Sequence, residues 1–205
     1  NGTYIPLGLN FVQETTIFRE YGPLAGNTMR LSYEVAPKIG NSLSRQTAEL
    51  DVRHYMRLGS SGLLATRVRA FDSWGASPDF LYFGGNSEMR GYQYLEFLGS
   101  KAGFLNAELR FPFIEAMLTP LGVLGGIRGV FFGNLGGGSF ADQPFKWFSN
   151  KAEVIRPIIA IDPNTGALTR GAPVRVDGIR LVDARASYGL GLETFALGFP
   201  IHFDW

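Results

Sequence analysis

The residues whose types and spacing suggest chemistry lie in one stretch of the chain, FGGNSEMRGY. Its arginine, Arg90, has a planar guanidinium that makes several charge-assisted hydrogen bonds at once, so it can clamp a loop against a charged wall. Gly91 and Tyr92 place a hinge and an aromatic ring directly after it. The stretch therefore predicts an anchoring site for a loop.

Two glycines precede this arginine and are expected to shape its loop. Gly84 and Gly85 permit positive φ angles and close backbone approach, so the connection can turn sharply. A phosphate cradle is the alternative for such a glycine-rich stretch, and also for the run Gly136–Gly138. A cradle of that kind opens a helix, and no helical pattern follows either stretch. We interpret both as turn or close-contact glycines.

Residue patterns of known catalytic sites do not occur in this sequence. His54 and His202 lie on different segments without the spacing of a metal-binding HExxH motif, and neither a nucleophile elbow nor a P-loop is present. There is no cysteine, which excludes thiolate metal sites and cysteine nucleophiles. Asp162, Asn164 and Gly166 resemble part of a calcium loop but lack its closing glutamate. We expect no enzyme activity, no cofactor and no metal.

The elements that must position the arginine show the period of β-strands. The clearest case is residues 45–58, RQTAELDVRHYMRL, where apolar and polar residues alternate. One face is apolar apart from His54: Ala48, Leu50, Val52, Met56 and Leu58. The other face carries Arg45, Thr47, Glu49, Asp51, Arg53, Tyr55 and Arg57, and the next segment adds Arg67 and Arg69. We interpret the charged face as a mutually neutralised wall, with a substrate path as the alternative.

Similar alternation recurs in about eight segments, which predicts an all-β, antiparallel fold. Pro112 is expected to end the strand at residues 105–111, because proline cannot donate to a ladder. Residues 114–124 are expected to form a short helical turn. Two long connections, 76–101 and 139–181, alternate with short turns, and we read the second as an outer loop with a small hairpin. Alternating short and long connections are typical of outer-membrane β-barrels.

Composition limits the classes of partner. The net charge is +1 and no basic run occurs, so nucleic acid is not indicated. Aromatic residues at 14%, together with 27 glycines, fit a membrane barrel and equally a soluble β protein. No apolar run reaches the roughly 18 residues of a membrane helix. The start, NGTYIPLGLN, lacks the basic and apolar parts of a signal peptide, so we expect a piece of a longer protein.

Four stretches, taken in order, resemble one known family. They read FGGNSEMRGY at 83–92, NAELRFPF at 106–113, FFGNLGG at 131–137 and SYGLGLETFALGFPIHFDW at 187–205. Together they resemble the barrel of the outer-membrane protein assembly and translocation superfamily, also called the bacterial surface antigen domain. The resemblance covers nearly the whole chain. It implies one antiparallel transmembrane β-barrel domain over residues 1–205, in which residues 76–101 fold back into the lumen.

The resemblance also implies how the loop is held. In that family an Arg-Gly-aromatic tip is bound by acidic residues on the two strands that follow it, which correspond here to Glu108 and Asn134, with Gly136 on the same wall. Asn134 stands where the family usually has an aspartate, so we expect Arg90 to have a single carboxylate partner and a weaker hold. The family barrel has about twice the strands counted here. A barrel of about eight strands is filled by its own side chains, so we expect the C-terminal half of a larger barrel that lacks one final strand.

The expected function follows from this resemblance. It is the insertion or translocation of polypeptides at the bacterial outer membrane, gated by the lumenal loop, with membrane lipid, client polypeptides and other subunits of an outer-membrane complex as partners. The first alternative is a passive barrel, either a porin-like channel or a structural component of a complex. The second is a soluble β-sandwich or lipocalin-like binding protein, because apolar-in, polar-out alternation occurs there as well.

Overall fold

The computed structural model describes residues 3–19, 22–119, 122–140, 143–155, 158–161, 168–196 and 199–205. The chain forms two compact units, one of residues 1–145 with 185–205 and one of residues 146–184. All regular elements among the described residues are β-strands, and every pairing between them is antiparallel. The predicted all-β, antiparallel class is confirmed.

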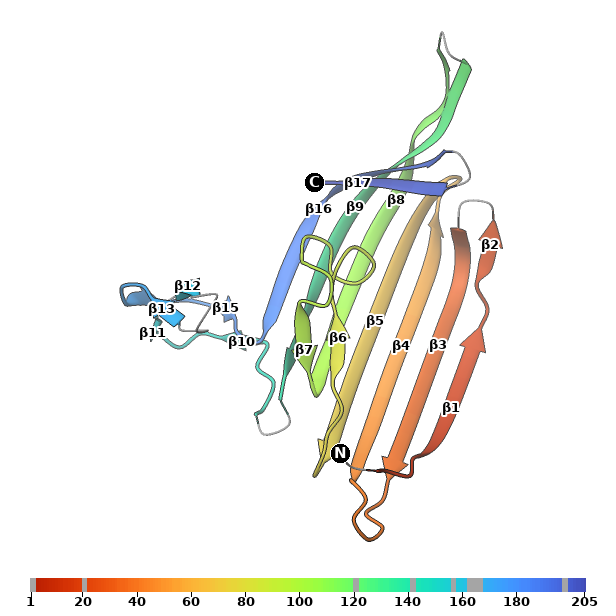
Figure 1. Ribbon diagram of the computed structural model, residues 1–205. Helices are drawn as coiled ribbons and strands as arrows, with labels where there is room; N and C mark the ends of the chain where they lie inside the picture. The colour runs from red at the N-terminus through yellow and green to blue at the C-terminus, as the bar shows by residue number, and fades with distance from the viewer. Residues whose placement is uncertain are drawn as a thin grey trace. The chain divides into compact units, whose positions relative to one another are not determined.

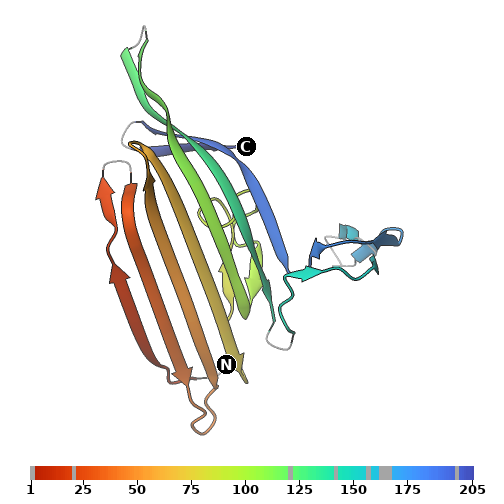
Figure 2. The same cartoon turned by 180° about the vertical axis from the view of Figure 1, so that it is seen from behind.

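The first unit is built on one large sheet (Figures 1 and 2). Its strands in spatial order are β1 (Leu7–Glu14), β3 (Gly22–Ala36), β4 (Arg45–Leu58), β5 (Gly62–Gly75), β8 (Lys101–Thr119), β9 (Gly122–Ser139), β16 (Ala184–Ala196) and β17 (Phe199–Asp204). The short β2 (Ile17–Arg19) also pairs with β3. Within the described residues β1 and β17 are the two edges and do not pair with each other, so the sheet is open.

The two faces of the sheet differ as the alternation predicts. One row runs across five strands through Met29, Val52, Val68, Leu105 and Leu135. We call this side the apolar face; Leu31, Val68 and Leu105 on it are 43%, 40% and 43% exposed. The opposite side, the loop face, carries Glu49, Asp51, Arg67, Arg69, Asn106, Glu108 and Arg110.

Two expectations about β8 and β9 are wrong. β8 does not end at Pro112 but continues to Thr119, and the described part of the expected helical turn, residues 114–119 and 122–124, is strand. The register shifts between Pro112 and Ile114, which marks a bulge. The residue left out of the ladder is Phe113, directly after Pro112, and proline is tolerated within a sheet at such a bulge. Apolar runs of this length do not by themselves separate strand from helix.

The connection between β5 and β8 lies against the loop face of the sheet (Figures 1 and 2). It contains a hairpin of β6 (Leu81–Phe83) and β7 (Phe97–Gly99) and an isolated bridge between Gly85 and Met89. Phe83 and Met89 are fully buried, at 0% exposure each. They pack with Phe71, Leu81, Ala102 and Phe104 in the main cluster of buried apolar residues. The core of this unit therefore lies between the loop and the sheet.

The second unit contains three short antiparallel ladders. They pair β10 (Phe148–Ser149) with β15 (Arg180–Leu181), β11 (Glu153–Ile155) with β14 (Val174–Val176), and β12 (Ile158–Ile161) with β13 (Leu168–Arg170). The expected connection at 139–181 thus holds a long two-stranded arm where we expected a loop with a small hairpin. Asp162, Asn164 and Gly166 lie outside the described residues.

Candidate anchoring site of the central loop

The backbone of the loop turns at the glycines that the sequence singled out. Gly84, Gly85 and Gly91 have φ angles of 142°, 79° and 88°, in a backbone region that residues with a Cβ rarely adopt. A Cβ on Gly84 would also come within 2.5 Å of the carbonyl oxygen of Gln93. The amide of Met89 donates to the carbonyl oxygen of Gly85 over 2.8 Å, which closes the turn that presents Arg90. These φ angles fit the turn role predicted for Gly84 and Gly85.

The guanidinium of Arg90 lies between two carboxylates. Its Nη2 is 2.8 Å from Oε1 of Glu108 on β8, and its Nη1 is 3.3 Å from Oδ1 of Asp204 on β17. The side chain is only 9% exposed and lies over the ring of Phe132, 5.0 Å from the ring centroid. The predicted pair of Arg90 and Glu108 is present. A buried guanidinium with two carboxylates is a strong, directional anchor.

The expectation that Arg90 has a single carboxylate partner, with Asn134 as the second group, is wrong: Asp204 is the second carboxylate, and among the described contacts the Asn134 amide binds Asn106 and Ser187. Its Nδ2 donates to Oγ of Ser187 over 3.0 Å, and Ser187 Oγ donates to the backbone carbonyl of Arg90 over 2.5 Å. Its Oδ1 accepts from Nδ2 of Asn106, which also donates to the carbonyl of Glu88. Asn134 therefore supports the loop backbone through two neighbouring side chains.

Asp204 is one functional residue that was not predicted from the sequence. β17 runs at a steep angle to its neighbours, which brings its end toward the loop (Figures 1 and 2). In the sequence, His202 and Asp204 alternate with Ile201 and Phe203, a signal that places both polar residues on one face of the last strand. Which residues Asp204 contacts depends on the curvature of that strand, and curvature cannot be predicted from the alternation of residue types.

Gly136 on the sheet and Tyr92 in the loop make further contacts between the loop and the sheet. A Cβ on Gly136 would lie 2.7 Å from Cβ of Phe104 and 2.9 Å from Sδ of Met89, so this glycine leaves the space that the methionine fills. The hydroxyl of Tyr92 donates to the carbonyl of Ala186 over 3.0 Å. Its ring meets Phe97 edge to face at 5.0 Å. The predicted wall position of Gly136 is thus a contact with the loop.

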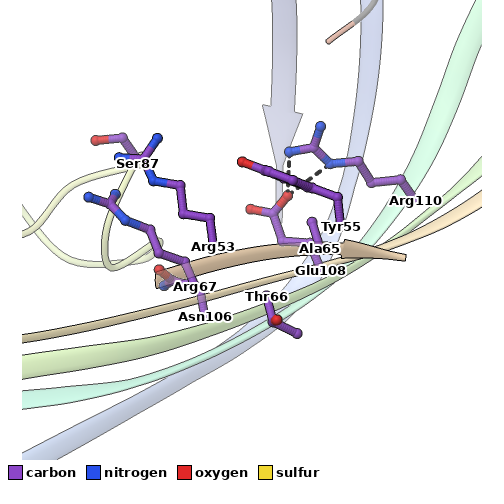
Figure 3. A pocket seen from close by; sticks show the side chains of 9 residues that line it. All are labelled: Arg53, Tyr55, Ala65, Thr66, Arg67, Ser87, Asn106, Glu108 and Arg110. Carbon is purple, nitrogen blue, oxygen red and sulfur yellow. Dashed lines mark hydrogen bonds and ion pairs between the residues drawn. The ribbon is translucent and has the colours of Figure 1, made fainter. Parts of the chain in front are cut away.

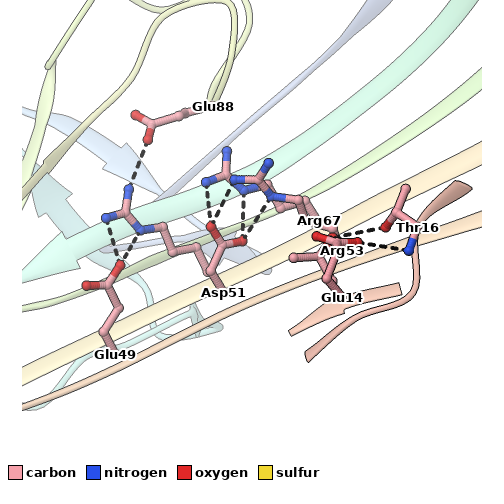
Figure 4. Close-up of polar contacts among 9 residues, drawn as sticks. Glu14, Thr16, Glu49, Asp51, Arg53, Arg67 and Glu88 are labelled. Atoms are coloured by element: carbon pink, nitrogen blue, oxygen red, sulfur yellow. Dashed lines mark hydrogen bonds and ion pairs between the residues drawn. The ribbon is translucent and has the colours of Figure 1, made fainter. Parts of the chain in front are cut away.

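A second charged residue of the loop, Glu88, binds the sheet as well. Its Oε1 is 3.1 Å from Nη1 of Arg69, and Arg69 also pairs with Glu49 at 2.8 Å (Figure 4). Its Oε2 accepts the backbone N–H of Gly84 over 2.9 Å. Glu88 was not among the residues predicted from the sequence, although it lies two positions before Arg90. Anionic and cationic loop residues therefore both find partners on the wall.

Further ion pairs on the loop face join residues of neighbouring strands or of the same strand. Asp51 accepts from Arg67 at 2.8 Å and from Arg53 at 3.2 Å (Figure 4). Arg110 donates to Glu108 at 2.7 Å, on the carboxylate oxygen that Arg90 leaves free (Figure 3). These pairs fit the interpretation of a mutually neutralised wall.

Two cavities flank the anchor. One of about 150 Å³ lies between strands β4, β5 and β8 and the loop residue Ser87 (Figure 3). The other, about 340 Å³, is lined by Arg90, its two carboxylate partners and His202, among others. Among the described residues no three His, Cys, Asp or Glu side chains are grouped to hold a metal ion. The arrangement offers paired charges that hold a segment in place.

Fold and site together define an all-β protein whose large antiparallel sheet carries a clamped loop on its charged face. A scan against protein-family models finds no match, and a search of curated proteins finds no match either. Within the described parts of the chain, no helix has the length and apolar character needed to span a membrane.

Proposed function

We propose that the chain forms part of a transmembrane β-barrel of the bacterial outer membrane, in a factor that inserts or translocates polypeptides. The sheet would be the wall, the apolar face would meet lipid, and residues 76–101 would occupy the lumen. Membrane lipid, client polypeptides and other subunits of an outer-membrane complex are the proposed partners. The resemblance of the four sequence stretches to the assembly and translocation superfamily supports this proposal.

One structural observation carries the proposal: apolar side chains lie exposed along one face of the sheet, while a loop and ion pairs cover the other. Leu9, Tyr33 and Phe131 on the apolar face are 79%, 41% and 48% exposed. Soluble proteins rarely leave contiguous apolar surface of more than a few hundred Å² uncovered. Transmembrane barrels require it, with an apolar outer band and a polar interior. A soluble sandwich would instead bury that face against a second sheet.

The proposed mechanism is gating by the loop. Arg90 anchors the loop, Glu108 and Asp204 bind its guanidinium, and Asn134 supports its backbone through Ser187. Because Asp204 lies on the edge strand β17, the anchor joins the loop to that edge. Movement of the loop would then be coupled to strand pairing at the seam of the barrel.

The orientation of the sheet in lipid can be tested with two adjacent positions. In a protein whose three native tryptophans are replaced by phenylalanine, Leu31→Trp would report on the apolar face and Ser32→Trp on the loop face. In vesicles with brominated lipid, we expect several-fold stronger quenching of the first variant, because quenching requires contact with the chains. Equal quenching at both positions, or a chain that stays soluble and monomeric without detergent, would contradict the proposal.

The assembly activity needs its own measurement. Liposomes that contain the wild-type protein should accelerate the insertion of an unfolded outer-membrane protein, while those containing Arg90→Ala should do so more slowly. If insertion with both proteins is no faster than with empty liposomes, the proposed assembly activity is contradicted, while the proposed barrel fold is not affected.

A passive barrel is the second candidate, and one observation favours it. Phe83 and Met89 of the loop are fully buried against the sheet, so the loop is packed as well as paired. A loop held in this way suits a stationary plug in a channel or a structural component. Steady ion conductance in planar bilayers, together with unchanged outer-membrane protein levels on depletion, would select this candidate.

A further inference from the structure

A group of three arginines lies at the end of the sheet where β4 turns into β5, and one of them, Arg110, also pairs with Glu108 of the anchor. They surround a cavity of about 50 Å³ that is lined by Arg57, Arg110 and Arg128 and by the turn serines Ser60 and Ser61. A cavity needs roughly 10–15 Å³ of volume measured in this way to hold one water. The cavity between the three arginines therefore has room for a group of several heavy atoms. None of its described lining residues is acidic. We call this the arginine cavity.

The register of the sheet explains why three arginines meet there. Arg57 pairs with Leu63 on β5, and Leu63 pairs with Arg110 on β8, so both arginines belong to one cross-strand row. On β9, Arg128 lies opposite Pro112, two residues beyond Arg110 on the same strand face. Neighbouring strands are about 4.8 Å apart and diagonal positions about 7–8 Å apart. The three guanidinium groups can therefore converge on one small ligand.

Hydrogen-bond capacity remains for such a ligand. Arg110 uses Nε and Nη2 on Glu108, and within the described residues its Nη1 has no partner. Arg57 donates from Nη2 to the carbonyl of Ser60 in the turn, over 3.1 Å. Its Nε and Nη1 have no hydrogen-bond partner among the described residues. The Oγ atoms of Ser60 and Ser61, 3.4 Å apart, add two hydroxyl groups at the rim.

The geometry points to a binding site for a phosphate group, which we propose as a further property of this protein. Several guanidinium forks and hydroxyl groups without a carboxylate match a tetrahedral oxyanion with multiple acceptor oxygens. The phosphate group could belong to free inorganic phosphate or to a phospholipid headgroup, which share this chemistry. The inference rests on the sheet register and the cavity, so it stands whether or not the protein assembles other proteins.

The test uses the full chain in dodecyl maltoside micelles, which contain no phosphate, and titrates inorganic phosphate by calorimetry. The wild type should bind phosphate. Arg57→Gln should weaken binding roughly tenfold, because charge-assisted hydrogen bonds are among the strongest a side chain makes. Arg57→Lys should restore binding only in part, since an ammonium lacks the fork. Arg57 is exposed, so these variants should fold, which circular dichroism would check.

The matched control is Arg175→Gln, which removes an arginine of 72% exposure in the second unit and should leave phosphate binding unchanged. No phosphate binding by the wild type, or equal binding by Arg57→Gln and Arg175→Gln, would overturn the proposal. Repeating the titration in phospholipid nanodiscs distinguishes the two sources. Loss of phosphate binding there means that a headgroup occupies the arginine cavity, and retained binding assigns it to free phosphate.

Discussion

Arg90 and Asp204 form an ion pair across a sequence separation of 114 positions, with Nη1 of the arginine 3.3 Å from Oδ1 of the aspartate. The pair joins the tip of the loop to the strand at one edge of the sheet. Together with Glu108 it gives the guanidinium two carboxylates in a site where the arginine is 9% exposed. The strength of the anchor therefore depends on β8 in the middle of the sheet and on β17 at its edge.

The first prediction concerns Arg90→Ala. It removes the cation that Glu108 and Asp204 share, although Arg110 still pairs with Glu108, and breaking a buried pair costs about 3–5 kcal/mol. We expect a loss of stability near the lower end of that range, because both carboxylates keep some exposure, 15% and 18%. Urea unfolding in detergent would measure the loss, and hydrogen exchange of residues 84–98 should increase.

Arg175→Ala is the control for this prediction, since that arginine pairs with Asp177 on the surface at 72% and 59% exposure. Exposed pairs contribute about 0–1 kcal/mol. If both variants lose the same stability and exchange at residues 84–98 is unchanged, Arg90 does not anchor the loop.

The second prediction concerns Gly136→Ala. The added methyl group would lie within 3 Å of Phe104 and Met89, which overpacks the contact between loop and wall. Overpacking typically costs about 1–3 kcal/mol. Gly133→Ala on the same strand is the matched control, because a Cβ there meets nothing within 4 Å. Equal thermal stability of the two variants would show that Met89 does not pack against Gly136.

The third prediction concerns Asn134→Asp, the residue usual in the family that the sequence resembles. Aspartate cannot donate to Ser187, and Ser187 has one proton, which it gives to the carbonyl of Arg90. We therefore expect the free energy of unfolding to fall by about 1–2 kcal/mol, and we expect Arg90 to be held no more strongly. A double-mutant cycle with Ser187→Ala would detect the coupling; additive losses, or a gain in stability, would contradict this account.

The fourth prediction separates packing from charge in the loop. Phe83→Ala removes a fully buried ring that stacks with Phe97 at 5.0 Å. Such truncations cost about 3–5 kcal/mol. Phe148→Ala, at 61% exposure, is the control and should change stability little. If Phe83→Ala releases the loop to exchange more than Arg90→Ala does, the loop behaves as a packed plug, which favours the passive barrel.

Much of the sheet could be predicted from the sequence because strand alternation is a local property. The two faces of residues 45–58 and the turn role of Gly84 and Gly85 follow from residue types alone. The partner Glu108 came from the family resemblance. The contacts of Asp204 and Glu88 depended on strand curvature and on where the loop lies, which no local pattern records. The course of β8 beyond Pro112 depended on a bulge.

The edge strand β1 has a practical consequence for handling the protein. Its residues are all exposed, its sequence LGLNFVQE carries only one charge, and no described strand pairs with its outer side. Natural proteins protect such edges with charges, prolines or a covering segment, because an uncovered one recruits further strands from solution. Purified preparations should therefore self-associate through β1 as concentration rises, and a lysine at Val12, which lies on the loop face, should keep them dispersed for the measurements above.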